Sequence, residues 1–116
     1  MARILVVDDD RQITMLVRIA LVRVGHDVEE ANCGRDAVAA VLAHPPDLVL
    51  LDYVMPDLSG AEVIEELRQH PECARVSIVM ATGELEPDEC AGSPHVLGKP
   101  YKLEELYAAV NAALKR

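Results

Sequence analysis

Short apolar runs and helical stripes alternate along this chain of 116 residues, and this alternation restricts its fold more than any other feature. The runs are rich in branched aliphatic side chains, as buried strands are. Between them, apolar residues recur every three or four positions, which is the spacing of one face of a helix. Strict alternation of strand and helix predicts an α/β fold in which helices cover both faces of a parallel sheet.

We predict five strands, at residues 4–7, 26–31, 48–51, 76–81 and 95–98. The third is apolar throughout, which indicates burial from both sides, and the second is more polar, which is typical of a strand near an edge. Helical stripes occupy residues 13–24, 37–42, 59–70 and 103–114. Residues 83–94 are rich in glycine, proline and acidic residues, so any helix there is short. Right-handed crossovers then produce a doubly wound sheet with its site at the carboxyl ends of the strands.

Helix boundaries are marked by recognisable residues. Asp10 is a plausible N-cap of the first helix, and Gly25 ends it. The pair Pro45-Pro46 closes the second helix. Ser59 and Glu62 have the spacing of a capping box, so we expect the third helix to begin at Ser59.

Composition excludes several classes of protein. The formal net charge of −9 argues against nucleic acid or an acidic membrane as a partner, and it suits a basic protein or a metal cation, or simply solubility. Three cysteines without a CxxC pair argue against a disulfide scaffold or a zinc site. The amino terminus does not resemble a signal peptide, and no apolar run approaches the roughly 20 residues of a membrane span. We therefore expect a cytoplasmic protein without membrane insertion.

Charged and hydroxyl side chains follow the predicted strands. The run 8–10 is three aspartates after the first strand, and Asp52 directly follows the apolar third strand. Thr82 ends the fourth strand and Lys99 ends the fifth. Because the carboxyl ends of parallel strands share one edge of the sheet, we expect these groups to lie close together.

This set of groups indicates phosphoryl chemistry assisted by a metal. Crowded carboxylates repel one another, and Mg²⁺, which prefers oxygen ligands and retains water, would relieve that repulsion. A carboxylate beside the metal can attack phosphorus, and the ammonium of Lys99 and the hydroxyl of Thr82 can stabilise the transferred oxygens. The chain contains no P-loop and no GxGxxG motif.

Each residue also has a simpler reading. Asp10 fits a helix cap and nothing more. Thr82 alone is more often a satisfied hydroxyl, and Lys99 alone is more often a surface lysine. Asp52 is the strongest single candidate, because a carboxylate at the end of an apolar strand is costly unless it is paired.

Four segments in this order, ILVVDDD, LLDYVMPDLSG, IVMATG and LGKPY, resemble the receiver domains of two-component response regulators. The resemblance extends along essentially the whole chain. It implies a single receiver domain over residues 1–116 with the flavodoxin-like strand order 2-1-3-4-5. It also implies a signalling switch with weak autophosphatase activity rather than an enzyme.

The resemblance assigns roles around a magnesium ion. Asp52 would be the phosphoacceptor and a metal ligand. Asp9 would bind Mg²⁺ directly, Asp8 would act through water, and the backbone carbonyl of Val54 would complete the protein ligands. The phosphoryl group would come from a phosphohistidine on a histidine kinase or a histidine phosphotransfer protein.

The resemblance also assigns the switch and the partner surface. Thr82 would be the switch hydroxyl, Lys99 would bind the phosphoryl group, and the Lys99-Pro100 peptide bond would be cis. Val54 and Glu84 would flank the water that hydrolyses the phosphoryl group slowly. The exposed side of the first helix would meet the partner, with Arg11, Met15 and Arg18 as candidates, and a homodimer is left open.

Three residues depart from the family pattern. Val96 stands where an aromatic switch residue is usual, Gly83 where alanine is usual, and Tyr101 where phenylalanine is common. The substitution at Val96, together with the short helix expected in residues 83–94, motivates an alternative, a protein-interaction module that does not depend on phosphorylation. A phosphatase with an aspartate nucleophile is set aside, because such an enzyme needs a second acid at the position of Val54.

Overall fold

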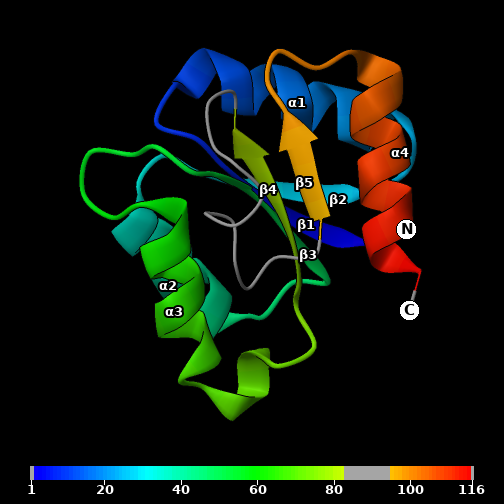
Figure 1. Cartoon of the computed structure of the whole chain (residues 1–116). Coiled ribbons are helices and arrows are strands. Elements are labelled where there is room, and N and C mark those ends of the chain that lie inside the picture. Colours follow the sequence, from blue (N-terminus) through cyan, green and yellow to red (C-terminus); the bar gives the residue numbers. More distant parts are fainter. Residues whose placement is uncertain (1, 83–94, 116) are drawn as a thin grey trace.

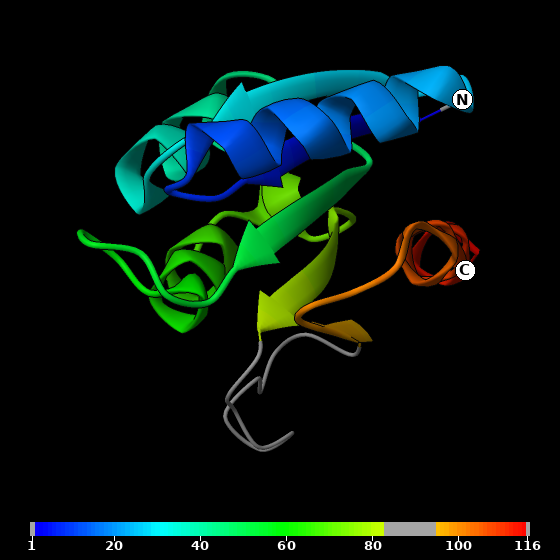
Figure 2. The ribbon, with the colours of Figure 1, turned by 90° about the horizontal axis from the view of Figure 1, so that it is seen from above.

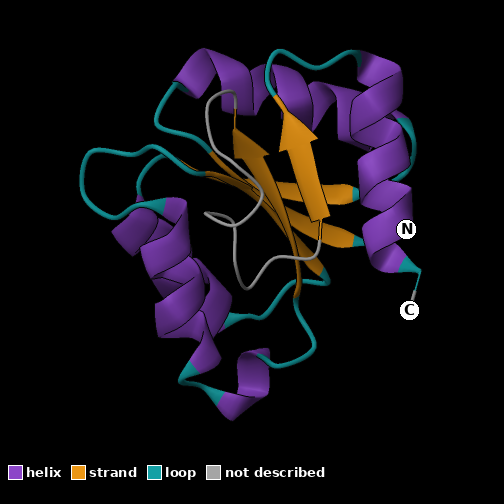
Figure 3. Ribbon diagram, viewed as in Figure 1, coloured by secondary structure: helices purple, strands orange, loops and turns teal. Residues whose placement is uncertain are grey.

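The computed structural model describes residues 2–82 and 95–115. Its centre is a parallel sheet of five strands in the order β2-β1-β3-β4-β5 (Figures 1 and 3). The strands are β1 (Arg3–Val7), β2 (Asp27–Ala31), β3 (Leu48–Asp52), β4 (Ser77–Thr82) and β5 (His95–Gly98). This strand order confirms the flavodoxin-like fold. Every predicted strand is present, and no strand end differs from its predicted position by more than one residue.

Four helices are described: α1 (Arg11–Arg23), α2 (Gly34–Ala43), α3 (Gly60–Arg68) and α4 (Leu103–Leu114). A short 3-10 turn, η1 (Pro71–Cys73), precedes β4. Asp10 caps α1, and Gly25 follows with a positive φ of 97°. Ser59 and Glu62 form the predicted capping box, although the helix itself begins one residue after Ser59. The predicted short helix in residues 83–94 lies outside the described residues.

The helices cover the sheet in two layers (Figure 2). On one face, α1 and α4 bury Val17, Leu21, Leu106 and Val110 against alternate residues of the central strands. On the other face, α2 and α3 pack onto a second cluster. Every residue of β3 is buried, whereas most of β2 is exposed at the sheet edge, as the polarity of its sequence predicts. Two filled faces explain why the central strands are apolar throughout.

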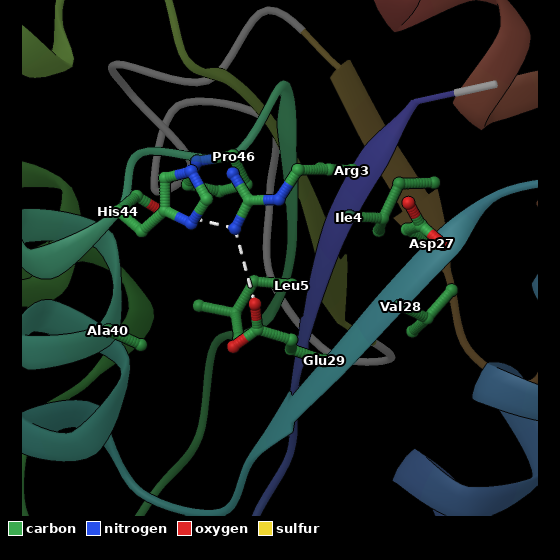
Figure 4. A pocket seen from close by; sticks show the side chains of 9 residues that line it. All are labelled: Arg3, Ile4, Leu5, Asp27, Val28, Glu29, Ala40, His44 and Pro46. Atoms are coloured by element: carbon green, nitrogen blue, oxygen red, sulfur yellow. Dashed lines mark hydrogen bonds and ion pairs between the residues drawn. The ribbon is translucent and has the colours of Figure 1, made fainter.

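The amino ends of the strands are closed by hydrogen bonds around Arg3. The Arg3 guanidinium donates to the carbonyl of Pro45 at 3.1 Å and pairs with Glu29 at 3.2 Å. Its backbone N–H donates to the carboxylate of Asp47 at 2.8 Å. A cavity of about 330 Å³ lies beside this network, and Figure 4 shows that Arg3 points into it toward Glu29 and His44. These contacts join β1 to β2 and to the segment before β3.

Among residues 2–82 and 95–115, no helix combines the length and the apolar character that crossing a membrane requires.

Candidate functional site

The opposite edge of the sheet gathers the predicted site residues. Asp8 directly follows β1, Asp52 ends β3, Thr82 ends β4 and Lys99 directly follows β5. The Lys99 Nζ lies 2.9 Å from an Asp8 carboxylate oxygen and 3.1 Å from one of Asp52. One ammonium therefore joins groups that are 91 and 47 residues away in sequence.

Three carboxylates form the acidic part of the site. One oxygen each of Asp8, Asp9 and Asp52 lies within 4.8 Å of the other two. Asp8 and Asp52 are buried, whereas Asp9 is exposed. Two oxygens on opposite sides of Mg²⁺ stand about 4.2 Å apart, twice the metal–oxygen distance. Small side-chain adjustments would thus bring the three groups around one ion, and an all-oxygen set open to solvent fits Mg²⁺.

Burial and charge act together on the ionisation of these groups. Burial raises the pKa of Asp52, the hydrogen bond and charge of Lys99 lower it by less, and the charges of Asp8 and Asp9 raise it further. Burial alone would lower the pKa of Lys99, but its hydrogen bonds to Asp8 and Asp52 and their charges raise it. One ammonium thus contacts two of the three carboxylates, and a second cation at the site would favour their ionised forms.

The loop after β1 is held by groups that the sequence prediction did not include. Asn32, just beyond β2, donates its side-chain amide to the carbonyl of Asp8 at 2.9 Å and to the hydroxyl of Thr14 at 3.2 Å. Asp8 in turn accepts the backbone N–H of Asp10 at 2.9 Å. Thr14 is fully buried on α1. Thr14 and Asn32 thus support the loop from two different elements.

The loop of residues 53–59 carries Val54, whose carbonyl is the expected fourth protein ligand. The loop is closed at its base, where the backbone N–H of Gly60 donates to the carbonyl of Tyr53 at 2.7 Å. Met55 anchors the middle of the loop in the core, with 8% of its surface exposed. The Val54 side chain is 66% exposed. The backbone of Val54 is therefore held between two anchored neighbours while its side chain faces solvent.

Asp57, in the same loop, was not predicted as a functional residue. Its two carboxylate oxygens accept the backbone N–H groups of Gly34 and Arg35 at 2.8 and 2.9 Å. These amides open α2, where they have no partner within the helix. The amides of Arg35 and Gly34, in that order, hold the pKa of Asp57 well below its usual range. From sequence, the residue reads as an ordinary turn aspartate after Met-Pro.

The remaining predicted residues line the β4–β5 side of the site. Thr82 is buried, and its carbonyl accepts the N–H of Lys99 at 2.9 Å. The Lys99-Pro100 peptide bond is cis, as predicted. Val96, at the position of the usual aromatic residue, is 48% exposed. Gly83 and Glu84 lie outside the described residues.

Helix α1 presents an unusual surface beside the site. Arg11, Arg18 and Arg23 are its charged residues, and it has no acidic ones, although the chain carries a net charge of −9. Its outer side exposes large apolar residues, namely Met15, Leu16, Ile19 and Val22. An apolar hollow lined by Ile13, Lys99, Pro100 and Tyr101 joins this helix to the site. The predicted Arg11 and Met15 are exposed, whereas Arg18 is half-buried and pairs with Glu30.

Comparison with known proteins is consistent with this geometry. The family model described as the response regulator receiver domain matches residues 4–111. Among solved structures, the chemotaxis protein CheY4 of Vibrio cholerae superimposes with a TM-score of 0.91 at 30% identity, covering 98% of this chain and 99% of that one. A putative response regulator from Chloroflexus aurantiacus gives a TM-score of 0.90 at 28% identity, with 99% and 98% covered.

Curated relatives are longer than this chain. "Response regulator MprA" of Mycolicibacterium vanbaalenii is 38% identical over 117 residues, which cover 98% of this chain and 51% of the relative. "Phosphate regulon transcriptional regulatory protein PhoB" of Rhizobium meliloti is 34% identical over 119 residues, with 98% and 52% covered. The chain thus spans about half the length of the curated relatives it matches.

Proposed function

This chain belongs to the response regulator receiver domain family of two-component signalling, and from that premise we propose that Asp52 accepts a phosphoryl group in a Mg²⁺-dependent reaction. The observation that carries the proposal is the contact of one ammonium, Lys99, with two carboxylates, Asp8 and Asp52, at the carboxyl edge of the sheet. An apolar strand that ends on a buried, partly neutralised carboxylate is costly for folding alone. A reaction at that carboxylate explains its placement.

The donor we propose is a phosphohistidine on a histidine kinase or a histidine phosphotransfer protein. A carboxylate oxygen of Asp52 attacks phosphorus, and a P–O bond forms as the P–N bond to the imidazole breaks. The electron pair of that bond returns to the imidazole nitrogen, which takes up a proton. The product is an acyl phosphate on Asp52 and a neutral histidine on the partner.

Asp8, Asp9, Asp52 and the carbonyl of Val54 would hold the metal, which supplies positive charge to the phosphoryl oxygens. Lys99, which pairs with the carboxylates before the reaction, would also stabilise the phosphoryl group after it. Its ammonium, already within 3.1 Å of Asp52, can follow the negative charge from the carboxylate to the new phosphoryl oxygens. Thr82, which ends the neighbouring strand β4, supplies the hydroxyl for a further oxygen.

Helix α1 is the surface we propose for the partner. It begins directly after the acidic loop, and its exposed apolar residues continue into the hollow formed by Ile13, Pro100 and Tyr101. Its arginines, Arg11 among them, favour a partner with acidic residues around its reactive histidine. We place this exchange in the cytoplasm, where the donor kinases of such domains act.

The phosphorylated state would end by slow hydrolysis at the same site. Water attacks phosphorus, the acyl P–O bond breaks, and inorganic phosphate leaves the regenerated carboxylate. Val54 follows Asp52 by two residues, and its side chain, which is 66% exposed, is accessible to incoming water. The rate of this hydrolysis would set how long the domain stays in its phosphorylated, signalling state.

The test is phosphorylation by acetyl phosphate in the presence of Mg²⁺, followed by intact mass measurement. We expect the gain of one phosphoryl group, which requires Mg²⁺ and is absent in Asp52→Asn. Tandem mass spectrometry after borohydride reduction should place the modification on Asp52. Far-ultraviolet circular dichroism of both proteins controls for folding.

If the folded protein gained nothing from acetyl phosphate or from a phosphohistidine donor, the phosphoacceptor function would be wrong. An interaction module independent of phosphorylation would then be the better account, and the exposed aliphatic Val96 would be its first candidate contact.

A further inference from the structure

The contact between Asp57 and α2 lies outside the acidic site, yet it bears on the loop that supplies a metal ligand. Asp57 is three residues after Val54 and five after Asp52. Both of its carboxylate oxygens accept backbone N–H groups from another element, at 2.8 and 2.9 Å. Two short, charge-assisted bonds to rigid helix amides fix both the position and the orientation of a carboxylate.

The beginning of α2 is shaped for this contact. A Cβ placed on Gly34 would stand 2.6 Å from the Cβ of Leu58 and 3.2 Å from its carbonyl oxygen. Any larger residue at Gly34 would therefore push the loop away. Leu58 packs against the core cluster on this face of the sheet. The loop thus meets α2 through the hydrogen bonds of Asp57 and through Leu58. Figure 1 shows the course of the loop beside α2.

The two ends of the loop are held differently. At its base, the backbone N–H of Gly60 donates a hydrogen bond to the carbonyl of Tyr53, and the N–H of Tyr53 donates one to the carbonyl of Ala81 on β4. At its outer end, Asp57 bonds α2. Val54 lies between these anchors with an exposed side chain, so the direction of its carbonyl depends on both. Releasing the outer anchor would remove one of the constraints on that carbonyl and leave those at Tyr53 and Met55.

We infer that Asp57 is a positioning residue for the metal site: its bonds to the first amides of α2 hold the 53–59 loop in the position from which the carbonyl of Val54 would bind the metal. This inference rests on the proposed function, because it concerns affinity for the same Mg²⁺. Groups that support metal ligands without touching the metal typically change affinity by roughly tenfold or more when removed. We expect a loss of about tenfold for Asp57→Ala.

The experiment is a Mg²⁺ titration of thermal unfolding for each variant, at constant ionic strength. An ion that binds only the folded state raises the melting temperature with a concentration dependence that gives the apparent Kd. Asp57→Ala and Gly34→Ala disturb one contact from its two sides, and the second keeps the aspartate charge. Asp57→Asn, which keeps one acceptor oxygen, should give an intermediate loss.

Asp47→Ala is the matched control. Asp47 is also an exposed aspartate whose carboxylate accepts a backbone N–H from another element, at 2.8 Å from Arg3, but at the amino end of the sheet. It should lower the melting temperature in the absence of metal and leave the apparent Kd for Mg²⁺ unchanged.

The outcomes separate the two ideas. Tenfold weaker binding in both Asp57→Ala and Gly34→Ala, with Asp47→Ala unchanged, supports the positioning role. If the wild type binds Mg²⁺ and the apparent Kd of both variants lies within twofold of the wild-type value, this inference is wrong and the proposed function stands. If Mg²⁺ affinity falls in Asp57→Ala but not in Gly34→Ala, the effect comes from the lost charge alone, and the positioning role is again wrong. A wild-type protein without any response to Mg²⁺ would refute the metal site itself.

Discussion

Gly60 offers a sharp test of how tightly the end of β3 is packed. A Cβ at this position would stand 2.7 Å from the sulfur of Met80, 2.9 Å from the carbonyl oxygen of Asp52 and 3.0 Å from the Cα of Tyr53. Two of these three atoms belong to the backbone of the segment that carries Asp52, the proposed phosphoacceptor, and Met80 is fully buried. None of the three can move away without disturbing the strand or the core.

The magnitude follows from two opposing effects. Forcing an extra methyl group into a packed interior costs about 1–3 kcal/mol. Alanine is favoured over glycine within a helix by at most about 1 kcal/mol, and Gly60 is the first residue of α3. We expect Gly60→Ala to lower the free energy of unfolding by roughly 1–2 kcal/mol, and the melting temperature by roughly 4–8 °C. The rate of phosphorylation by acetyl phosphate should also fall.

Urea unfolding followed by circular dichroism measures the first effect, because the chain has no tryptophan. Gly98→Ala is the control for stability: a Cβ there meets nothing within 4 Å, so we expect a change within about 0.5 kcal/mol. If Gly60→Ala were as stable as the wild type and equally reactive, the packing argument for the end of β3 would be wrong.

Three further predictions concern the charges. Asp52→Asn should raise the free energy of unfolding at pH 7 without metal by roughly 1 kcal/mol, because the folded-state pKa of Asp52 is raised and its ionised form is disfavoured. Urea unfolding measures this gain. The gain should become smaller at acid pH and turn into a loss in excess Mg²⁺. Lys99→Met should destabilise the metal-free protein by roughly 1–2 kcal/mol, less than for a fully buried pair because the lysine is 26% exposed, yet it should tighten Mg²⁺ binding in a calorimetric titration, since a competing cation is gone. The pKa of Asp57 is lowered in the folded state, so its stabilisation is present above the unfolded pKa near 4 and is lost as the pH falls; between pH 5 and pH 2.5, wild type should lose more stability than Asp57→Asn.

Much of the fold could be predicted from local patterns. The uniformly apolar residues before Asp52 predicted a central strand, and every residue of β3 is buried. Asp10 and Ser59 predicted two helix starts, because a cap acts on amides two or three residues away. The prediction of a helix from Ser59 to residue 70 was too long at both ends, since Ser59 is the cap itself and a separate 3-10 turn begins at Pro71.

The sequence predicted which charged residues gather at the candidate site, but not the hydrogen bonds that hold them in place. Strand ends identified Asp52 and Lys99, because parallel strands align their carboxyl ends regardless of detail. Asn32 and Asp57, whose hydrogen bonds hold the loops of that site, were not predicted. Each acts on backbone groups 22 to 24 residues away, and nothing in the local sequence of either one marks its partner.

The sequence by itself determined the element types, their order and the residues delivered to one edge of the sheet, because periodicity, caps and strand ends are short-range properties. Only the tertiary structure decided that Lys99 neutralises Asp8 and Asp52 together, and that Asp57 joins the 53–59 loop to α2. Those contacts depend on distances of about 3 Å between elements far apart in the chain. Such distances are set by how the helices pack onto the two faces of the sheet.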